Sequence, residues 1–156
     1  MSRPVDLARR IAALGIGPGH RVLEVGAGSG YSAAILSRLA GEVVSLERYR
    51  ALAIDASAHV AALTLSNVRI LHHDGLAPMS ELGLFERIFV EAALTEPPPA
   101  LLAALGPDGI LVYARSTADR RQRLIKLVRN SSGEVDESDL GACRLVLCAP
   151  GIADSL

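Results

Sequence analysis

One stretch near the start of the chain, residues 21–31, combines a short apolar run with closely spaced glycines. It reads R-V-L-E-V-G-A-G-S-G-Y, and Val22, Leu23 and Val25 form a run typical of a strand buried on both faces. From Tyr31 onward the apolar side chains change to helical spacing. The order strand, glycine turn, helix within about 20 residues predicts the first part of a βαβ unit.

The spacing of the glycines separates two kinds of nucleotide-binding loop. A dinucleotide fingerprint requires G-x-G-x-x-G, but here the third glycine comes one position early, at Gly30, and Tyr31 occupies the place reserved for glycine. The pattern E-x-G-x-G-x-G, which begins at Glu24, is instead similar to the first motif of Rossmann-type S-adenosylmethionine-dependent methyltransferases. Three glycines alone also fit an ordinary tight turn, so the loop needs support from the rest of the chain.

Acidic residues accompany three consecutive apolar runs. Glu24 belongs to the first run, Glu47 ends the second, and Asp74, followed by Gly75, comes after the third. Because ligands of open α/β sheets bind outside the carboxyl ends of the strands, we expect the three carboxylates at one edge. Glu47 can accept both hydrogen bonds from a ribose diol. NAD binding would explain Glu47 but gives no role to the other two acids.

The methyltransferase resemblance assigns roles to these residues. It implies that Glu24 lies near the amino-acid half of S-adenosylmethionine and that Asp74 accepts a hydrogen bond from the adenine amino group. The expected cofactor site gathers the glycine loop and the strand ends: Glu24, Gly26, Ala27, Gly28, Ser29, Gly30, Glu47, Arg48, Asp74, Gly75 and Glu91. For Glu91 three interpretations stay open: a contact with the cofactor ammonium, the exclusion of an anionic substrate, or a solvated acid at a strand end.

Composition limits the class of protein. Half of the 156 residues are hydrophobic, which suits a single folded domain over residues 1–156. The net charge is −1, so nucleic acid is not expected as a partner, and we interpret the group Arg120, Arg121 and Arg123 as a solvated face. No apolar run reaches the roughly 20 residues that span a bilayer, and two cysteines fit a reduced, cytoplasmic protein. The four histidines lack metal-ligand spacing, so no metal is expected.

Strand and helix patterns alternate along most of the chain. We expect helices at 4–14, 31–40, 50–65 and 97–105, strands at 22–25, 43–46, 68–71, 87–91 and 110–114, and a turn at 106–109. The segment 122–129 fits a strand or a helix, and we favour two antiparallel strands, there and at 140–148. The predicted fold is α/β, a Rossmann-like doubly wound, mostly parallel sheet with a C-terminal antiparallel hairpin.

With these motifs the sequence resembles the protein-L-isoaspartate O-methyltransferases. The matching motifs are V-L-E-V-G-A-G-S-G-Y at 22–31, S-L-E-R at 45–48, N-V at 67–68, H-D-G at 73–75, F-E-R-I-F-V-E-A-A at 85–93, P-x-x-L-L-x-x-L-x-P-x-G at 98–109 and R-L-V-L-C-A-P at 144–150. The resemblance implies methylation of the free carboxylate of an isoaspartyl residue in a peptide or protein, or of a related acid. Such chemistry depends mainly on positioning and on the exclusion of water.

The chain departs from the family pattern at its start and at two positions. The usual N-terminal extension is missing, and the chain begins at a Ser-x-Pro motif in which Ser2 matches the serine near the reacting carboxylate, our tentative catalytic residue. His73 and Glu91 replace smaller residues of the family. One alternative is therefore a catalytically reduced module that binds S-adenosylmethionine and acts through a protein partner. A second subunit, giving a homodimer, would be another way to cover the exposed face.

Overall fold

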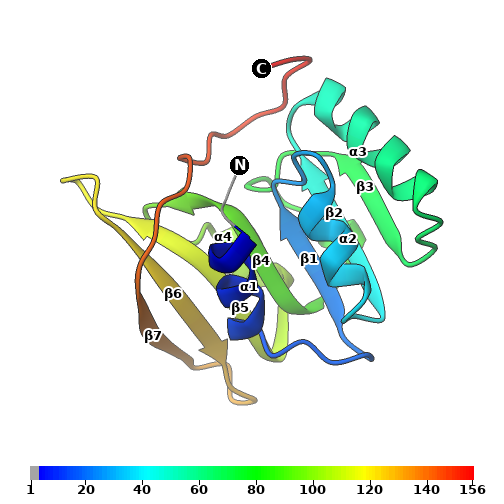
Figure 1. The fold of residues 1–156 in the computed structure, drawn as a ribbon. Coiled ribbons are helices and arrows are strands. Elements are labelled where there is room, and N and C mark those ends of the chain that lie inside the picture. Colours follow the sequence, from blue (N-terminus) through cyan, green and yellow to red (C-terminus); the bar gives the residue numbers. More distant parts are fainter. Residues whose placement is uncertain (1–3) are drawn as a thin grey trace.

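Seven strands form one sheet in the order β3-β2-β1-β4-β5-β6-β7, and helices flank it (Figure 1). The computed structural model describes residues 4–156. The strands are β1 (Arg21–Val25), β2 (Glu42–Glu47), β3 (Val68–His72), β4 (Phe85–Leu94), β5 (Leu105–Ser116), β6 (Gln122–Arg129) and β7 (Val135–Ala142). The helices are α1 (Pro4–Ala13), α2 (Tyr31–Ser37), α3 (Arg50–Ala62), α4 (Pro99–Ala104) and a short 3₁₀ turn, η1 (Ser80–Leu82).

The chain direction within the sheet explains where a ligand can bind. Strands β3, β2, β1, β4 and β5 run parallel, whereas β6 and β7 are antiparallel additions. The sheet grows outward from β1 on one side through β2 and on the other through β4, so the strand order reverses beside β1. In open α/β sheets this switch point leaves a crevice at the carboxyl ends of the strands. The predicted mostly parallel sheet is confirmed.

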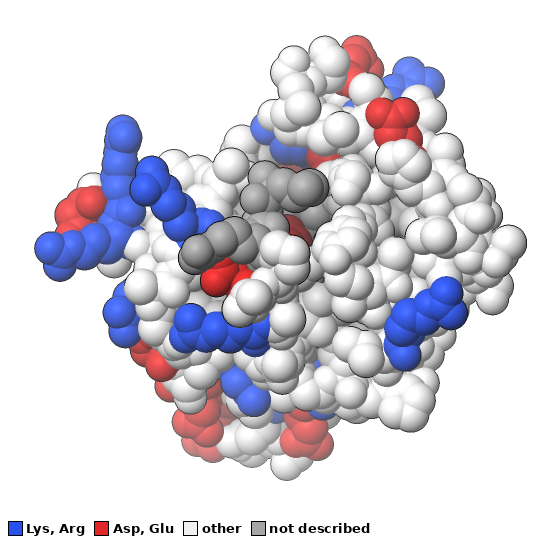
Figure 2. Space-filling view, viewed as in Figure 1, with Lys and Arg blue, Asp and Glu red and all other residues white. Residues whose placement is uncertain are grey.

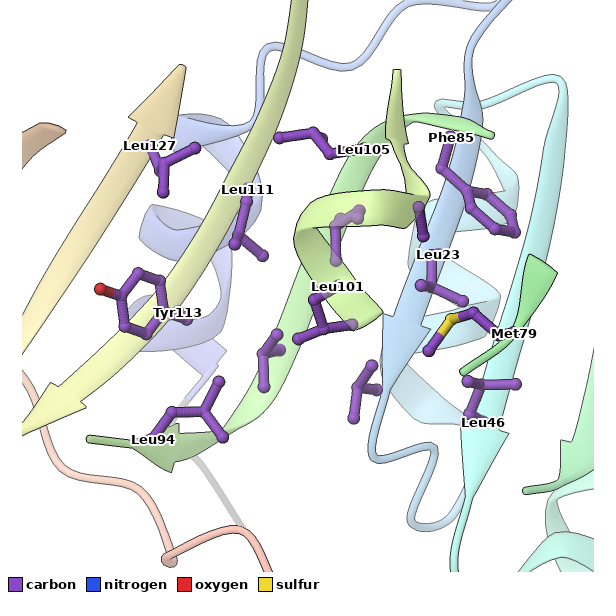
Figure 3. Packing of buried hydrophobic residues seen from close by; sticks show 14 of the residues in the cluster. Leu23, Leu46, Met79, Phe85, Leu94, Leu101, Leu105, Leu111, Tyr113 and Leu127 are labelled. Atoms are coloured by element: carbon purple, nitrogen blue, oxygen red, sulfur yellow. The ribbon is translucent and has the colours of Figure 1, made fainter. Parts of the chain in front are cut away.

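The pleat of the strands sends alternate side chains into two cores. On one face Leu23 and Leu46 pack with Leu101 of α4, in the larger cluster of buried side chains (Figure 3). On the other face Val22 and Phe89 pack against α1 and α2. Glu24 lies two positions after Val22 and Glu91 two positions after Phe89, so both belong to the α1 and α2 face. Glu47 follows Leu46 directly and therefore points away from the face of Leu46, to the same side as the other two acids.

Two sequence-based predictions were wrong. The expected turn at 106–109 is part of β5, where the pairing with β4 shifts and Asp108 takes a φ of +53°. The last strand is Val135–Ala142 instead of 140–148. It is a polar, exposed edge strand, so it lacks the apolar alternation of a half-buried strand. Segment 143–148 is irregular and touches β4 through a bridge between Ala93 and Leu147.

The remaining elements agree with the sequence-based predictions. Helices predicted at 4–14, 31–40 and 50–65 exist and end one to three residues early, and segment 122–129 is a strand. Within residues 4–156, no helix has the length and apolar character needed to cross a membrane. Within the same range, His, Cys, Asp and Glu side chains form no cluster of three or more that could hold a metal.

Candidate active site

The glycine loop between β1 and α2 bends as the sequence predicts. Gly26, Gly28 and Gly30 all have positive φ values, +99°, +53° and +81°. The loop is fixed to β2, because the N–H groups of Gly26 and Ala27 donate to the carbonyl of Leu46 at 2.8 and 3.1 Å. A Cβ on Gly28 would meet no atom within 4 Å, so the loop borders open space.

Glu47, at the end of β2, holds the glycine loop from the side. One of its carboxylate oxygens accepts the N–H of Gly28 at 2.9 Å and the other accepts the N–H of Tyr49 at 3.0 Å. Although the residue is buried, its carboxylate lies on the wall of a cavity. Each oxygen keeps a free lone pair, so the carboxylate can still accept two hydroxyl groups.

Asp74 and Gly75 form the next part of the same wall. Asp74 accepts the N–H of Leu76 at 2.9 Å and the N–H of Gly151 at 2.6 Å. A Cβ on Gly75 would lie only 2.4 Å from Cγ1 of Val25, so a glycine is required where the chain passes the end of β1. The conformation of Asp74 is therefore set by backbone groups and by close packing.

These strand ends enclose a cavity of about 400 Å³ at the switch point of the sheet. This volume lies within the range of roughly 300–1,000 Å³ that is common for small-molecule and cofactor sites. Gly26, Gly28, Glu47, Asp74 and Gly75 all line it, together with Arg48 and Glu91. Three carboxylates, the bend of the glycine loop and apolar walls suit a nucleoside with a charged tail, so the residues present fit S-adenosylmethionine.

Glu24 lies behind the cavity wall. Its side chain is fully buried and accepts a hydrogen bond from the hydroxyl of Ser45, its register partner on β2. Its Oε1 atom has no hydrogen-bond partner among the described residues. Burial is the main cause that raises the pKa of this carboxyl to about 8, and the neighbouring Glu91 and Glu47 carboxylates raise it further. Glu24 is therefore held between β1 and β2 and lines neither the first cavity nor its neighbour.

Glu91, at the carboxyl end of β4, forms an ion pair that the sequence-based analysis missed. Its carboxylate is 2.5 Å from Nη1 of Arg10, whose side chain is only 3% exposed and lies over the ring of Phe89. The sequence of α1 contains a signal for this ion pair, because Leu7, Arg10 and Ile11 share the buried face of the helix. An arginine at a core position of an amphipathic helix requires a buried acceptor.

A second cavity, of about 570 Å³, adjoins the first. Gly26, Gly28, Glu91 and Val146 line both, so the two cavities meet at the glycine loop and the end of β4. The second cavity also contains Ala27 and Ser29 of the predicted set. Gly30 is not on either wall, and its absent side chain instead admits Ala56 of α3 at a close distance. Ser2, the predicted catalytic residue, lies outside the described residues.

Arg48 connects the cofactor cavity to the end of the chain. Its guanidinium donates to the carbonyls of Gly151 and Pro150 at 2.9 and 3.3 Å and lies over the ring of Tyr49. The last residues then continue across the carboxyl edge of the sheet to α3 (Figure 1), where the N–H of Arg50 donates to the carbonyl of Ala153 at 2.8 Å. The sequence-based analysis did not foresee this covering segment.

Comparisons with known proteins identify the family. The model of the family described as protein-L-isoaspartate(D-aspartate) O-methyltransferase (PCMT) matches residues 1–151. A protein-L-isoaspartate O-methyltransferase from Rhodopseudomonas palustris strain BisA53 is 42% identical over 156 residues, which cover 100% of this chain and 72% of the relative. Protein-L-isoaspartate O-methyltransferase 2 from strain HaA2 of the same species is 44% identical, with 100% and 71% covered.

Solved structures show the same relationship. A protein-L-isoaspartate O-methyltransferase superposes with a TM-score of 0.88 at 27% identity, over 96% of this chain and 48% of that chain. This chain therefore spans about half the length of that protein. A methyltransferase of this type from Plasmodium falciparum, solved with S-adenosyl-L-homocysteine, gives a TM-score of 0.74 at 25% identity, over 96% and 75% of the two chains. The chain belongs to the protein-L-isoaspartate O-methyltransferase family, a family of S-adenosylmethionine-dependent methyltransferases.

Proposed function

We propose that this chain transfers a methyl group from S-adenosylmethionine to the free carboxylate of an isoaspartyl-type residue in a peptide or protein, or of a related acid. The observation that carries the proposal is the junction of two cavities at Gly26, Gly28 and Glu91. The first cavity has carboxylates and apolar walls that suit a nucleoside, and the second opens beside it to solvent. A cofactor in one and an acceptor in the other would meet at this junction.

Different residues of the first cavity would bind different parts of the cofactor. Glu47 faces the space in which a ribose diol would donate, and Asp74 offers the acceptor for a base. The glycine loop leaves room beside Gly28 for the amino-acid end. When bound, S-adenosylmethionine supplies an electrophilic methyl group on a positively charged sulfur.

The acceptor side suits an anion because its one carboxylate is already paired. Glu91 lines both cavities and would repel an acidic substrate, but the guanidinium of Arg10 compensates its charge at 2.5 Å. A carboxylate acceptor is nucleophilic without losing a proton, so the chain needs no general base here. Its contribution is to orient the two reactants and to exclude water. Ser2 remains our proposed contact on the acceptor side.

Cofactor binding can be measured separately from catalysis. Titration calorimetry with S-adenosylhomocysteine should show binding by the wild type and about 100-fold weaker binding by Glu47→Ala, since two hydrogen bonds to a charged group are lost. Glu42→Ala is the matched control, because Glu42 lies at the other end of β2 and pairs only with surface arginines. Undiminished binding by Glu47→Ala would contradict the assigned site.

Catalysis is tested with a labelled methyl donor and two peptides that differ only in an isoaspartyl or an aspartyl linkage. We expect label in the isoaspartyl peptide alone, as a base-labile methyl ester. Tight S-adenosylhomocysteine binding without transfer to any carboxylate would favour the alternative, a cofactor-binding module that acts through a protein partner.

A further inference from the structure

A basic groove lies beside the second cavity, which we call the acceptor cavity. It has a volume of about 630 Å³ and is lined by Arg120, Arg121, Arg123 and Arg144, with no Asp or Glu among the described residues on its wall. The first three arginines come from the loop between β5 and β6 and from the start of β6, and Figure 2 shows basic side chains gathered over this projecting loop. We call this feature the arginine groove.

The arginines of the groove are available to a ligand. Arg120 and Arg144 are exposed, and their guanidinium groups make no hydrogen bond or ion pair with any residue in the range 4–156. Arg121 and Arg123 have partners outside the groove, Asp119 at 3.1 Å and Asp139 at 2.8 Å, in exposed pairs. Such surface pairs contribute little, and a guanidinium has five donors, so both side chains can bind a further anion.

The arginine groove is joined to the acceptor cavity by the segment that contains Arg144 and Leu145. The side-chain amide of Gln122 binds both backbone groups of Leu145, donating to its carbonyl at 3.0 Å and accepting its N–H at 2.7 Å. Arg144 and Leu145 line both the arginine groove and the acceptor cavity. A chain bound with its reacting carboxylate in the cavity would therefore continue into the groove.

We propose that the arginine groove binds acidic side chains that flank the methylated residue, so that this enzyme prefers acidic peptides. The inference rests on the proposed function, because it assigns the flanking sequence of the same substrate. A peptide is favoured over a nucleic acid because the groove adjoins the cavity in which we place the methylated carboxylate, and because the chain as a whole carries a net charge of −1.

The test compares one isoaspartyl peptide in three forms, with glutamate, glutamine or lysine at the flanking positions. At low ionic strength we expect kcat/KM for the glutamate form to exceed that for the glutamine form about fivefold, and the advantage to disappear in high salt. In Arg120→Gln/Arg144→Gln the ratio between the two peptides should fall to about one. The control Arg38→Gln/Arg69→Gln removes the same charge from the C-cap of α2 and from β3 and should keep the wild-type ratio.

Equal kcat/KM values for the glutamate and glutamine peptides with the wild type, or an unchanged ratio in the groove variant, would overturn the inference. A second measurement separates this result from a failure of the proposed function. Fluorescence anisotropy with the unreactive aspartyl peptides reports binding even if no peptide is methylated, and it should show the same glutamate preference and the same loss in Arg120→Gln/Arg144→Gln. Tighter binding of a single-stranded oligonucleotide than of the glutamate peptide would also overturn it.

Discussion

The two sides of the active site are held together in different ways. On the cofactor side, Glu47 and Asp74 lie at the ends of neighbouring parallel strands, and backbone N–H groups fix their carboxylates. On the acceptor side, Glu91 is fixed by one side chain, Arg10, that lies 81 positions away in the sequence. A main-chain framework tolerates single substitutions of surrounding side chains, whereas an ion pair fails when either partner is removed.

The largest effect that distinguishes the two sides is expected for Arg10→Ala. The substitution leaves the Glu91 carboxylate without its ion-pair partner and leaves a gap beside the ring of Phe89. Breaking a buried ion pair lowers the free energy of unfolding by about 3 kcal/mol. Urea denaturation measures it. Arg9→Ala, the exposed neighbour, should cost less than about 1 kcal/mol.

The double variant Arg10→Met/Glu91→Leu sharpens the interpretation. Removing both charges and keeping the volume should restore most of the lost stability, because a buried ion pair is often replaceable by apolar side chains. The same variant should lose methyl transfer to a carboxylate if Glu91 helps to arrange the junction. A double variant no more stable than Arg10→Ala would show that packing, and not charge, is what Arg10 provides.

The next effect concerns the framework of the cofactor side. Gly75→Ala places a Cβ at 2.4 Å from Cγ1 of Val25, and overpacking of this kind costs about 2 kcal/mol. Because the displaced backbone carries Asp74, affinity for S-adenosylhomocysteine should fall together with stability. Gly19→Ala is the control, since a Cβ there meets no atom within 4 Å. Adding Val25→Ala to Gly75→Ala makes room for the new Cβ and should restore both the stability and the affinity for S-adenosylhomocysteine.

A different kind of effect appears as a pH dependence of stability. Burial raises the pKa of Glu24 in the folded protein from 4.5 to about 8, so the folded state binds a proton that the unfolded state has released. Between these pH values stability falls as pH rises, by at most about 1.4 kcal/mol per pH unit, and it levels off above pH 8.

Glu24→Gln removes this titration, so its unfolding free energy minus that of the wild type should grow from about pH 5 to pH 8. Urea midpoints measured across this range test the difference. Glu96→Gln, at an exposed position, should give a difference that does not change with pH. A constant difference for Glu24→Gln would mean that Glu24 is ionised in the folded protein.

The same contrast explains what the sequence could predict. The cofactor side follows from local patterns, because a strand, a glycine turn and an acid lie within short stretches around Glu24, Glu47 and Asp74. The acceptor side depends on pairings between distant segments that no local pattern encodes. Arg10 resembles any charge in a surface helix until Glu91 is placed beside it.

The position of the last strand, at the edge of the sheet, was also predicted wrongly from the sequence. The exposed strand β7 (Val135–Ala142) has a polar sequence because neither face is covered well enough to require apolar side chains. The apolar segment 143–148 was mistaken for that strand, although its side chains instead border the cavities. Its apolar side chains mark the border of the cavities and not a buried strand, since Val146 and Leu147 are exposed.

The smallest predicted effect tests the segment that covers the cofactor side. Residues 151–156 bind Asp74 through the N–H of Gly151 at 2.6 Å, and the carbonyls of Ala153 and Asp154 accept the first N–H groups of α3 at 2.8 and 3.0 Å. Tyr49, the N-cap residue, makes no side-chain capping bond, so this segment acts as the cap.

Truncation after Pro150 should therefore lower stability by about 1 kcal/mol, the usual value of a helix cap, and weaken S-adenosylhomocysteine binding about fivefold as Asp74 and Arg48 lose their partners. Leu156→Ala, which keeps every backbone bond and shortens one side chain on the cavity wall, should change affinity less than twofold. If the truncated chain binds as tightly as the wild type, the strand ends alone form the cofactor side. Equal losses in both variants would instead assign the effect to apolar contact by Leu156.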